Sequence, residues 1–197
     1  ESLFLSQEYA RRHMYNTAIE ETFRAIQLSP DYLPAHIQLG EVLAHQGRHE
    51  VAASKFFMIG ETYKARGDIN GAIISYEKVL DLTPLDLSVR ARLIDLLKTH
   101  GRIDQALEHY MALGDAYYQL AQVDKARETY QEALRLVPRG DDPSQAWKLK
   151  ILRAVAAIDI QRFQWQRALP AVSELRELNP DDEWTAITLI DLYYKVG

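Results

Sequence analysis

The sequence contains no cysteine, and this absence removes several kinds of chemistry. A chain without thiols forms no disulfide, no thiolate zinc site and no cysteine nucleophile. The lack of cysteine fits a reducing compartment, so we expect a cytoplasmic protein. No apolar run approaches the roughly 20 residues that span a bilayer, and no charged start followed by an apolar block predicts a signal peptide. We therefore expect no membrane partner.

Basic residues are outnumbered by acidic ones. The chain has 23 Lys and Arg against 28 Asp and Glu, which gives a formal net charge of -5. An acidic chain repels phosphate backbones, so we expect no nucleic-acid partner. Apolar residues make up 47% of the chain and charged residues 26%, which is typical of a soluble folded protein.

Catalytic and metal-binding motifs are missing as well. The sequence has no Gly-rich phosphate loop, no G-x-S-x-G and no H-E-x-x-H. His45 and His49 are four residues apart, but Gly47 between them should end a helix, so we predict a loop pair and no metal site. The adjacent Asp141 and Asp142 precede Pro143, which predicts a helix cap. We predict no catalytic residue, no metal site and no cofactor.

Helical periodicity is what the sequence has in quantity. Segments with apolar residues at helical spacing alternate with short breaks, whereas the alternation typical of strands is missing. No break is long or polar enough to be a domain linker, so we predict one all-α array over residues 1–197. Four of these segments end at a proline, namely Pro30, Pro84, Pro138 and Pro180. Aspartates stand where helices should start and should cap them: Asp68, Asp86, Asp104, Asp142 and Asp182.

Small and aromatic residues recur at fixed places in these segments. An Ala lies 12 residues before each of the four prolines. An aromatic residue follows an Ala by four positions at Ala52, Ala72, Ala106 and Ala126. Gly60 and Gly114 each precede a Tyr by three residues, inside an expected helix. A helical Gly costs roughly 1 kcal/mol relative to Ala, so we expect a packing reason for both.

This pattern resembles the tetratricopeptide repeat (TPR) family, whose 34-residue motif is a helix–turn–helix. The resemblance covers nearly the whole chain and implies an all-α, right-handed helical-repeat superhelix, an α-solenoid. It rests on six copies that share a small residue at the same motif position: Ala18, Ala52, Ala72, Ala106, Ala126 and Ala168.

Two segments fit two positions of the repeat at once. Ala52 and Phe56 fit the second helix of one repeat, while Phe56, Gly60 and Tyr63 fit the first helix of the next. We therefore predict that residues 48–66 form one shared helix, and that residues 102–120 form another. The working unit then has three helices in 54 residues. The predicted units cover residues 1–30, 33–66, 53–84, 87–120, 107–138 and 144–180, with a partial unit at 183–197.

The C-terminal segment departs from this scheme. Residues 144–162 predict one long helix, residues 165–178 a second, and residues 183–197 a further first helix without its partner. Apolar residues surround much of this last helix, whereas a terminal repeat usually needs a polar outer face. We expect either a sequence cut from a longer array, which we prefer, or self-association through residues 183–196.

The resemblance also implies a binding surface, because first helices of the family line a concave groove that holds a peptide or a partner helix. Four successive repeats have an acid at the same motif position, namely Glu41, Glu61, Asp95 and Asp115, which predicts an acidic ladder that attracts a basic or amide-rich segment. The alternative is a solvated face with local pairs such as Glu61 with Lys64 and Asp95 with Lys98. Lys148, Lys150 and Arg153 form a smaller basic cluster. The predicted groove positions are Gln7, Arg11, Glu41, His45, Glu61, Lys64, Asp95, Lys98, Asp115, Tyr118 and Gln119.

We predict a protein–protein interaction scaffold or adaptor without catalysis of its own. The chain lacks the Lys and Asn pattern with which some family members clamp a C-terminal carboxylate. One alternative is a regulatory or substrate-docking array of a larger enzyme, such as a glycosyltransferase or a peptidase. Another is a helical-repeat RNA binder of the pentatricopeptide or half-TPR kind, against which the acidic groove positions argue.

Overall fold

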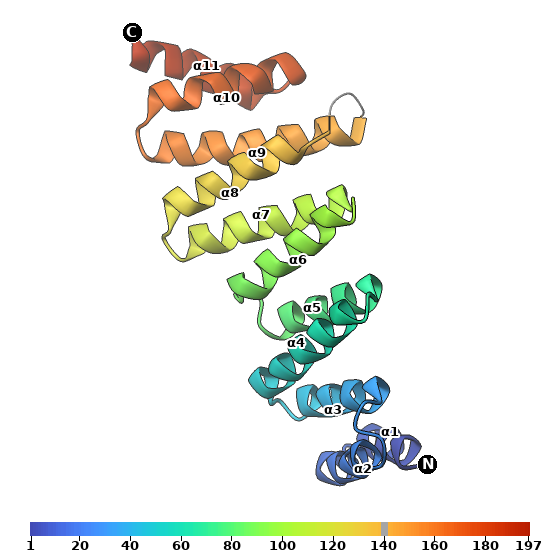
Figure 1. The fold of residues 1–197 in the computed structure, drawn as a ribbon. Coiled ribbons are helices and arrows are strands. Elements are labelled where there is room, and N and C mark those ends of the chain that lie inside the picture. Colours follow the sequence, from blue (N-terminus) through green and yellow to red (C-terminus); the bar gives the residue numbers. More distant parts are fainter. Residues whose placement is uncertain (139–141) are drawn as a thin grey trace. The chain divides into compact units, whose positions relative to one another are not determined.

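The computed structural model describes residues 1–138 and 142–197. In these ranges the chain forms eleven α-helices and no strand, as the periodicity predicts (Figure 1). None of the described helices is long and apolar enough to cross a bilayer. The helices are α1 (Ser2–Arg11), α2 (Tyr15–Leu28), α3 (Leu33–His45), α4 (His49–Ala65), α5 (Ile69–Leu82), α6 (Leu87–Thr99), α7 (Ile103–Gln119), α8 (Val123–Leu136), α9 (Asp142–Gln161), α10 (Trp165–Leu178) and α11 (Glu183–Val196).

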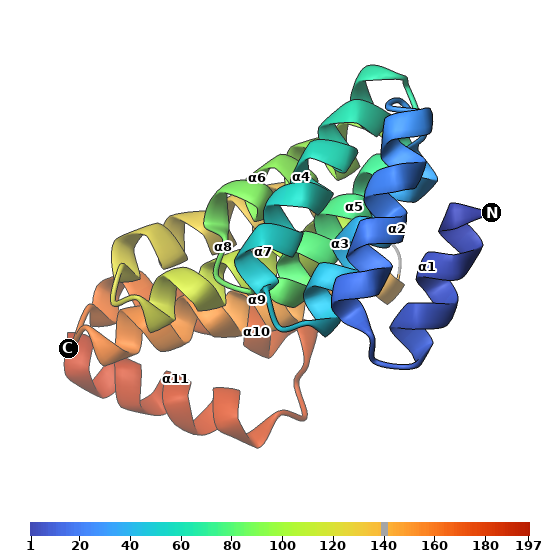
Figure 2. The ribbon, with the colours of Figure 1, turned by 90° about the horizontal axis from the view of Figure 1, so that it is seen from below.

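The helices belong to two compact units, Glu1–Leu96 and Leu97–Gly197. In the first unit α1 to α5 follow one another, and each helix packs on the next (Figures 1 and 2). In the second unit α7 to α11 are arranged in the same way. Each helix therefore buries residues against its sequence neighbours, as in a repeat array.

Six of the described helices end in short turns of one recurring kind. The second residue after α3, α4 and α6 is a glycine with positive φ: Gly47, Gly67 and Gly101. The same place after α1, α7 and α9 holds His13, Ala121 or Phe163, each with φ near 58–59°. This left-handed conformation suits glycine, so the turn geometry recurs even where the sequence has no glycine to signal it.

Three of the predicted aspartate caps are confirmed. Asp68 Oδ1 accepts a hydrogen bond from Gly71 N at 2.9 Å, and Asp86 and Asp182 accept equivalent bonds from residues three positions later. The prediction for Asp104 is wrong, because α7 begins one residue earlier, at Ile103. Its carboxylate instead accepts a hydrogen bond from Trp147 Nε1 at 3.1 Å. Of the other two predicted caps, Asp141 lies outside the described residues, and Asp142 is the first residue of α9, with its side chain outside the description.

Helix α4 runs without a break from His49 to Ala65 and is buried by both neighbours. Its first half places Phe56 against Gly40 of α3, and its second half places Gly60 against Tyr76 of α5. Helix α7 is equally continuous from Ile103 to Gln119. The partition of the chain into 54-residue units that share these helices stays a prediction.

The glycines inside helices have the packing reason that the sequence predicts. A Cβ atom added to Gly60 would lie 2.8 Å from Cε1 of Tyr76, and one added to Gly114 would lie 2.2 Å from Cε1 of Tyr130. Both distances are shorter than real Cβ contacts. The missing side chains therefore let a tyrosine ring from the next helix lie directly on the glycine backbone.

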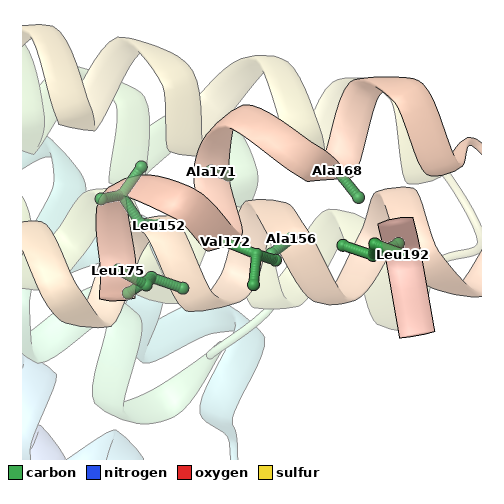
Figure 3. Close-up of a cluster of buried hydrophobic side chains, with 7 residues drawn as sticks. All are labelled: Leu152, Ala156, Ala168, Ala171, Val172, Leu175 and Leu192. Carbon is green, nitrogen blue, oxygen red and sulfur yellow. The ribbon is translucent and has the colours of Figure 1, made fainter. Parts of the chain in front are cut away.

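The last three helices enclose a separate apolar core (Figure 3). Small and branched side chains from α10 lie between Leu152 and Ala156 of α9 and Leu192 of α11. On α11 only Thr185 and Leu192 are buried, while Ile187, Ile190 and Tyr194 stay exposed. The buried members of this core are Leu152, Ala156, Ala168, Ala171, Val172, Leu175 and Leu192.

Candidate functional site

The eleven predicted groove positions are all exposed or partly exposed. The side chains at several of these positions contact the adjacent helix, so they are not fully available to a ligand. Glu61 accepts a hydrogen bond from the Tyr76 hydroxyl, and Asp115 accepts one from the Tyr130 hydroxyl at 2.5 Å. Burial, followed by the hydrogen bond and charge of these carboxylates, raises the pKa of both tyrosines well above the usual range.

The local ion pair expected for Glu61 is wrong. Its carboxylate lies 3.5 Å from Nη1 of Arg92 on α6 instead of pairing with Lys64. Glu41 likewise lies 2.5 Å from Nζ of Lys78 on α5. Three acids of the predicted ladder, Glu41, Glu61 and Asp115, thus hold neighbouring helices together, which reduces the charge that they offer to a ligand.

Most of the remaining groove positions with defined contacts also contact another helix. His45 stacks on Tyr15 of α2 with ring centroids 6.5 Å apart, and Lys98 Nζ lies 3.2 Å from the Tyr110 hydroxyl. Tyr118 donates its hydroxyl hydrogen to Gln161 of α9. Arg11 pairs with Glu8 on its own helix, whereas Gln7, Lys64 and Gln119 are exposed.

A pocket of about 390 Å³ lies in the first unit, between α4, the end of α5 and the start of α6. We call it the first pocket. Arg92 closes one side, with its guanidinium carbon 5.4 Å from the centroid of the Phe57 ring. Asp86 also lines the pocket and caps α6. The lining residues are Glu50, Ala53, Ser54, Phe57, Val79, Thr83, Asp86, Ser88, Val89 and Arg92.

A larger pocket, of about 570 Å³, lies in the second unit between α9, α10 and the start of α11. We call it the second pocket. Arg153 Nη2 lies 2.9 Å from Asp182 Oδ2, and the same guanidinium carbon lies 4.7 Å from the Trp184 ring centroid. The lining residues are Ala146, Leu149, Lys150, Arg153, Ala154, Ala157, Leu175, Asn179, Asp182 and Thr185.

The two pockets are the same structural site built twice. Eight lining residues of the first pocket correspond to eight of the second at a constant separation of 96 residues. Of these eight residues, four come from a long helix, which is α4 in the first pocket and α9 in the second. Two come from the next helix or its end, and two from the start of the helix after that. The pairs are Glu50 and Ala146, Ala53 and Leu149, Ser54 and Lys150, Phe57 and Arg153, Val79 and Leu175, Thr83 and Asn179, Asp86 and Asp182, and Val89 and Thr185.

The linings differ in charge, although the helices that form them correspond. The first pocket contains Glu50, Asp86 and Arg92, with a formal charge of -1. The second contains Lys150, Arg153 and Asp182, with a formal charge of +1. Desolvation acts against ionisation of Asp182, but hydrogen bonds from Thr185 and the charge of Arg153 outweigh it and lower the pKa of this carboxyl.

Sequence reasoning missed both pockets, because none of their lining residues is among the eleven groove positions. It did find the basic cluster, of which Lys150 and Arg153 line the second pocket, whereas Lys148 pairs with Glu174 of α10. One signal in the sequence could have indicated the pockets. Asp86 and Asp182, which were predicted as caps, each cap the third helix of a pocket.

No cluster of three or more potential metal ligands occurs in residues 1–138 and 142–197. His45 ends α3 and His49 begins α4, with Gly47 at φ 82° between them. Gly47 thus separates two helices, as predicted, but the two histidines lie at the ends of these helices and not in the loop.

Two segments of the chain match a known repeat family. The family description "tetratricopeptide repeat" matches residues 56–84 and, separately, residues 110–139. These segments are the second half of α4 with α5, and the second half of α7 with α8. No curated protein matches the sequence.

Among solved structures, a TPR repeats protein from Bacteroides fragilis has the same fold, with a TM-score of 0.55 and 14% identity over 96% of this chain and 95% of that one. A thermophilic TPR protein of Thermus thermophilus is 19% identical over 98% and 97% of the two chains, with a TM-score of 0.37. The Cut9 and Hcn1 hetero-tetramer of the APC/C aligns at 16% identity and a TM-score of 0.36, and this chain spans 42% of the chain that it matches. Two segments of this chain thus match the tetratricopeptide repeat family, and the array has the fold of a known TPR repeats protein.

Proposed function

We propose that this chain is a protein-interaction scaffold that binds segments of partner proteins on its exposed helix faces, and that it catalyses no reaction itself. The observation that carries the proposal is the pocket that recurs 96 residues apart with a different lining. A repeat fold offers the same backbone frame several times, and exchange of a few side chains then changes what each copy binds. Pocket volumes of about 390 and 570 Å³ are sufficient to bury a side chain of a partner.

The first pocket supports a partner with a basic segment. Glu50 is exposed at its rim and forms no ion pair with any residue that the structure describes. Asp86 belongs to the same lining, and the predicted groove acids Glu41 of α3 and Glu61 of α4 lie in the same unit. Because the groove acids already bind Lys78, Tyr76 and Arg92, we assign the attraction for a basic side chain mainly to Glu50.

A binding selection tests this function. Random nonapeptides displayed on phage are selected on immobilised residues 1–197, and the enriched peptides are titrated against wild type and Glu50→Lys. We expect one enriched class to contain Lys or Arg beside an apolar residue and to lose about tenfold in affinity with Glu50→Lys. The matched control is Glu128→Lys, at an exposed position of α8. The absence of any enriched peptide, or equal binding to wild type and both variants, would contradict the proposal.

The other roles predicted from the sequence stay predictions. Docking for an enzymatic domain, and self-association through residues 183–196, are both compatible with a scaffold. The exposed Ile187, Ile190 and Tyr194 of α11 support self-association.

A further inference from the structure

We infer that the second pocket is a docking site for an acidic segment of a partner protein. An apolar side chain of that segment enters the pocket, and a neighbouring Asp or Glu carboxylate pairs with Lys150 and Arg153. The inference rests on the proposed function and deepens it, because it gives one of the two pockets a ligand chemistry of its own.

The floor of the second pocket accepts an apolar group. Leu149 and Leu175 contribute aliphatic surface from two helices, and the small Ala154 and Ala157 leave the space above α9 open. Asn179 at the end of α10 adds an amide group that can bond to the backbone of an extended segment. An apolar floor with a few polar groups at the edge is the usual construction of a ligand pocket in a protein.

Lys150 supplies a positive charge to the lining of the second pocket. It is exposed at the rim, and its Nζ lies 5.2 Å from the centroid of the Trp147 ring. It forms no ion pair with any acid in the described ranges, whereas the neighbouring Lys148 pairs with Glu174. The aromatic contact limits the motion of the lysine side chain, which lowers the entropy cost of binding a carboxylate.

Arg153 is held in a fixed orientation beside Lys150. Its Nη2 donates to both carboxylate oxygens of Asp182, at 2.9 and 3.1 Å, and its guanidinium lies over the Trp184 ring. A guanidinium has five N–H donors, and these two bonds use only one of its nitrogens. The remaining donors can bind a second carboxylate, as arginine often does at interfaces.

The surroundings favour an acidic protein segment over RNA. Arg153 lies over the Trp184 ring and Lys150 over the Trp147 ring, so these rings are already occupied as stacking surfaces for bases. Asp181, Asp182 and Glu183 form a run of three acids at the start of α11, which repels the many phosphates of an RNA strand more strongly than the one or two carboxylates of a short peptide segment.

The first pocket is an internal control for this specificity. At the positions of Lys150 and Arg153 it has Ser54 and Phe57, and Glu50 replaces Ala146. The two sites share their helix arrangement, so a difference in the peptides that they bind must come from the side chains that line them, which also include Arg92 in the first pocket. An acidic segment is therefore expected at the second pocket and a basic segment at the first.

Selection of random displayed nonapeptides on residues 1–197 also tests this inference, with different variants. Lys150→Glu reverses the charge at the second pocket, and Ala154→Phe fills the pocket without a change of charge. Lys125→Glu is the matched control, because Lys125 is also exposed and lies over an aromatic ring, 5.6 Å from the centroid of Tyr117. A single-stranded oligouridine serves as a competitor for bound peptides.

We expect an enriched class of peptides with Asp or Glu next to a large apolar residue. Both pocket variants should weaken its binding about tenfold, Lys125→Glu less than twofold, and oligouridine should not displace it. Enrichment of basic peptides alone, or acidic peptides that bind both pocket variants like wild type, would overturn this inference and leave the proposed function intact. Displacement by oligouridine would replace the protein segment with RNA, and the lack of any enriched peptide would refute the proposed function as well.

Discussion

Substitution of Gly114 by alanine probes the helix packing on which the array depends. In an ordinary helix this change stabilises by about 1 kcal/mol, because alanine is the better helix former. Here the new Cβ would lie 2.2 Å from Cε1 and 2.6 Å from Cζ of Tyr130. The Tyr130 ring is 3% exposed and its hydroxyl donates to Asp115, so it cannot move without loss of packing and of a hydrogen bond.

The expected balance follows from these terms. Overpacking of a dense core costs about 1–3 kcal/mol, and a hydrogen bond to a charged group contributes about 1.5–3 kcal/mol. Against the gain of about 1 kcal/mol in helix propensity, we expect Gly114→Ala to destabilise α7 and α8 by about 2 kcal/mol. In a Tyr130→Ala background the clashing side-chain atoms, Cδ1 included, are absent, so the same change should stabilise by about 1 kcal/mol.

Native-state hydrogen exchange is the appropriate assay, because repeats of an array can open separately and a single unfolding midpoint can conceal this. Exchange of the α7 and α8 amides is measured in wild type, in both single variants and in the double variant. A change of sign between the two backgrounds supports the packing argument. An equal stabilisation by Gly114→Ala in both backgrounds would refute it.

Three further predictions concern the turns, a buried ion pair and the last helix. Ala121→Gly should stabilise the second unit by about 1 kcal/mol in urea unfolding, because Ala121 has φ 58°, and Gly101→Ala should destabilise by a similar amount; effects of the same sign would contradict this. Asp159→Ala should lower the free energy of unfolding by about 3 kcal/mol, because Arg127 donates to this fully buried carboxylate at 2.6 and 2.9 Å and would lose its partner. A loss below about 1 kcal/mol would contradict this. If α11 mediates self-association, light scattering should give wild type a mass above 22.6 kDa and Ile190→Glu the monomer mass, whereas a monomeric wild type would exclude this role.

The sequence predicts the local features of the fold well, because helix periodicity, capping and small-residue spacing act over short distances. The continuous α4 and the packing role of Gly60 are examples. The non-glycine turns at His13, Ala121 and Phe163 gave no signal, since these residues adopt a conformation that their types do not favour.

The contacts of the candidate site were harder to predict, because they connect different helices. Glu61 has a lysine three residues later on its own helix, yet it binds Tyr76, which comes 15 residues later on α5. The correspondence of the two pockets was also hidden, because the spacing between them is 96 residues and differs from the 54-residue repeat. The backbone had to be known before Ser54 and Lys150 could be recognised as equivalent.

Capture of partners from the source lysate tests the scaffold function most directly. Residues 1–197 and the double variant Glu50→Lys/Lys150→Glu are immobilised, the lysate is passed over both at low and high salt, and retained proteins are quantified by mass spectrometry. If the chain is a scaffold that binds through these charges, wild type should retain a set of proteins at low salt and release them at high salt. The double variant should not retain them. Retention of the same proteins by both forms at both salt concentrations would contradict it.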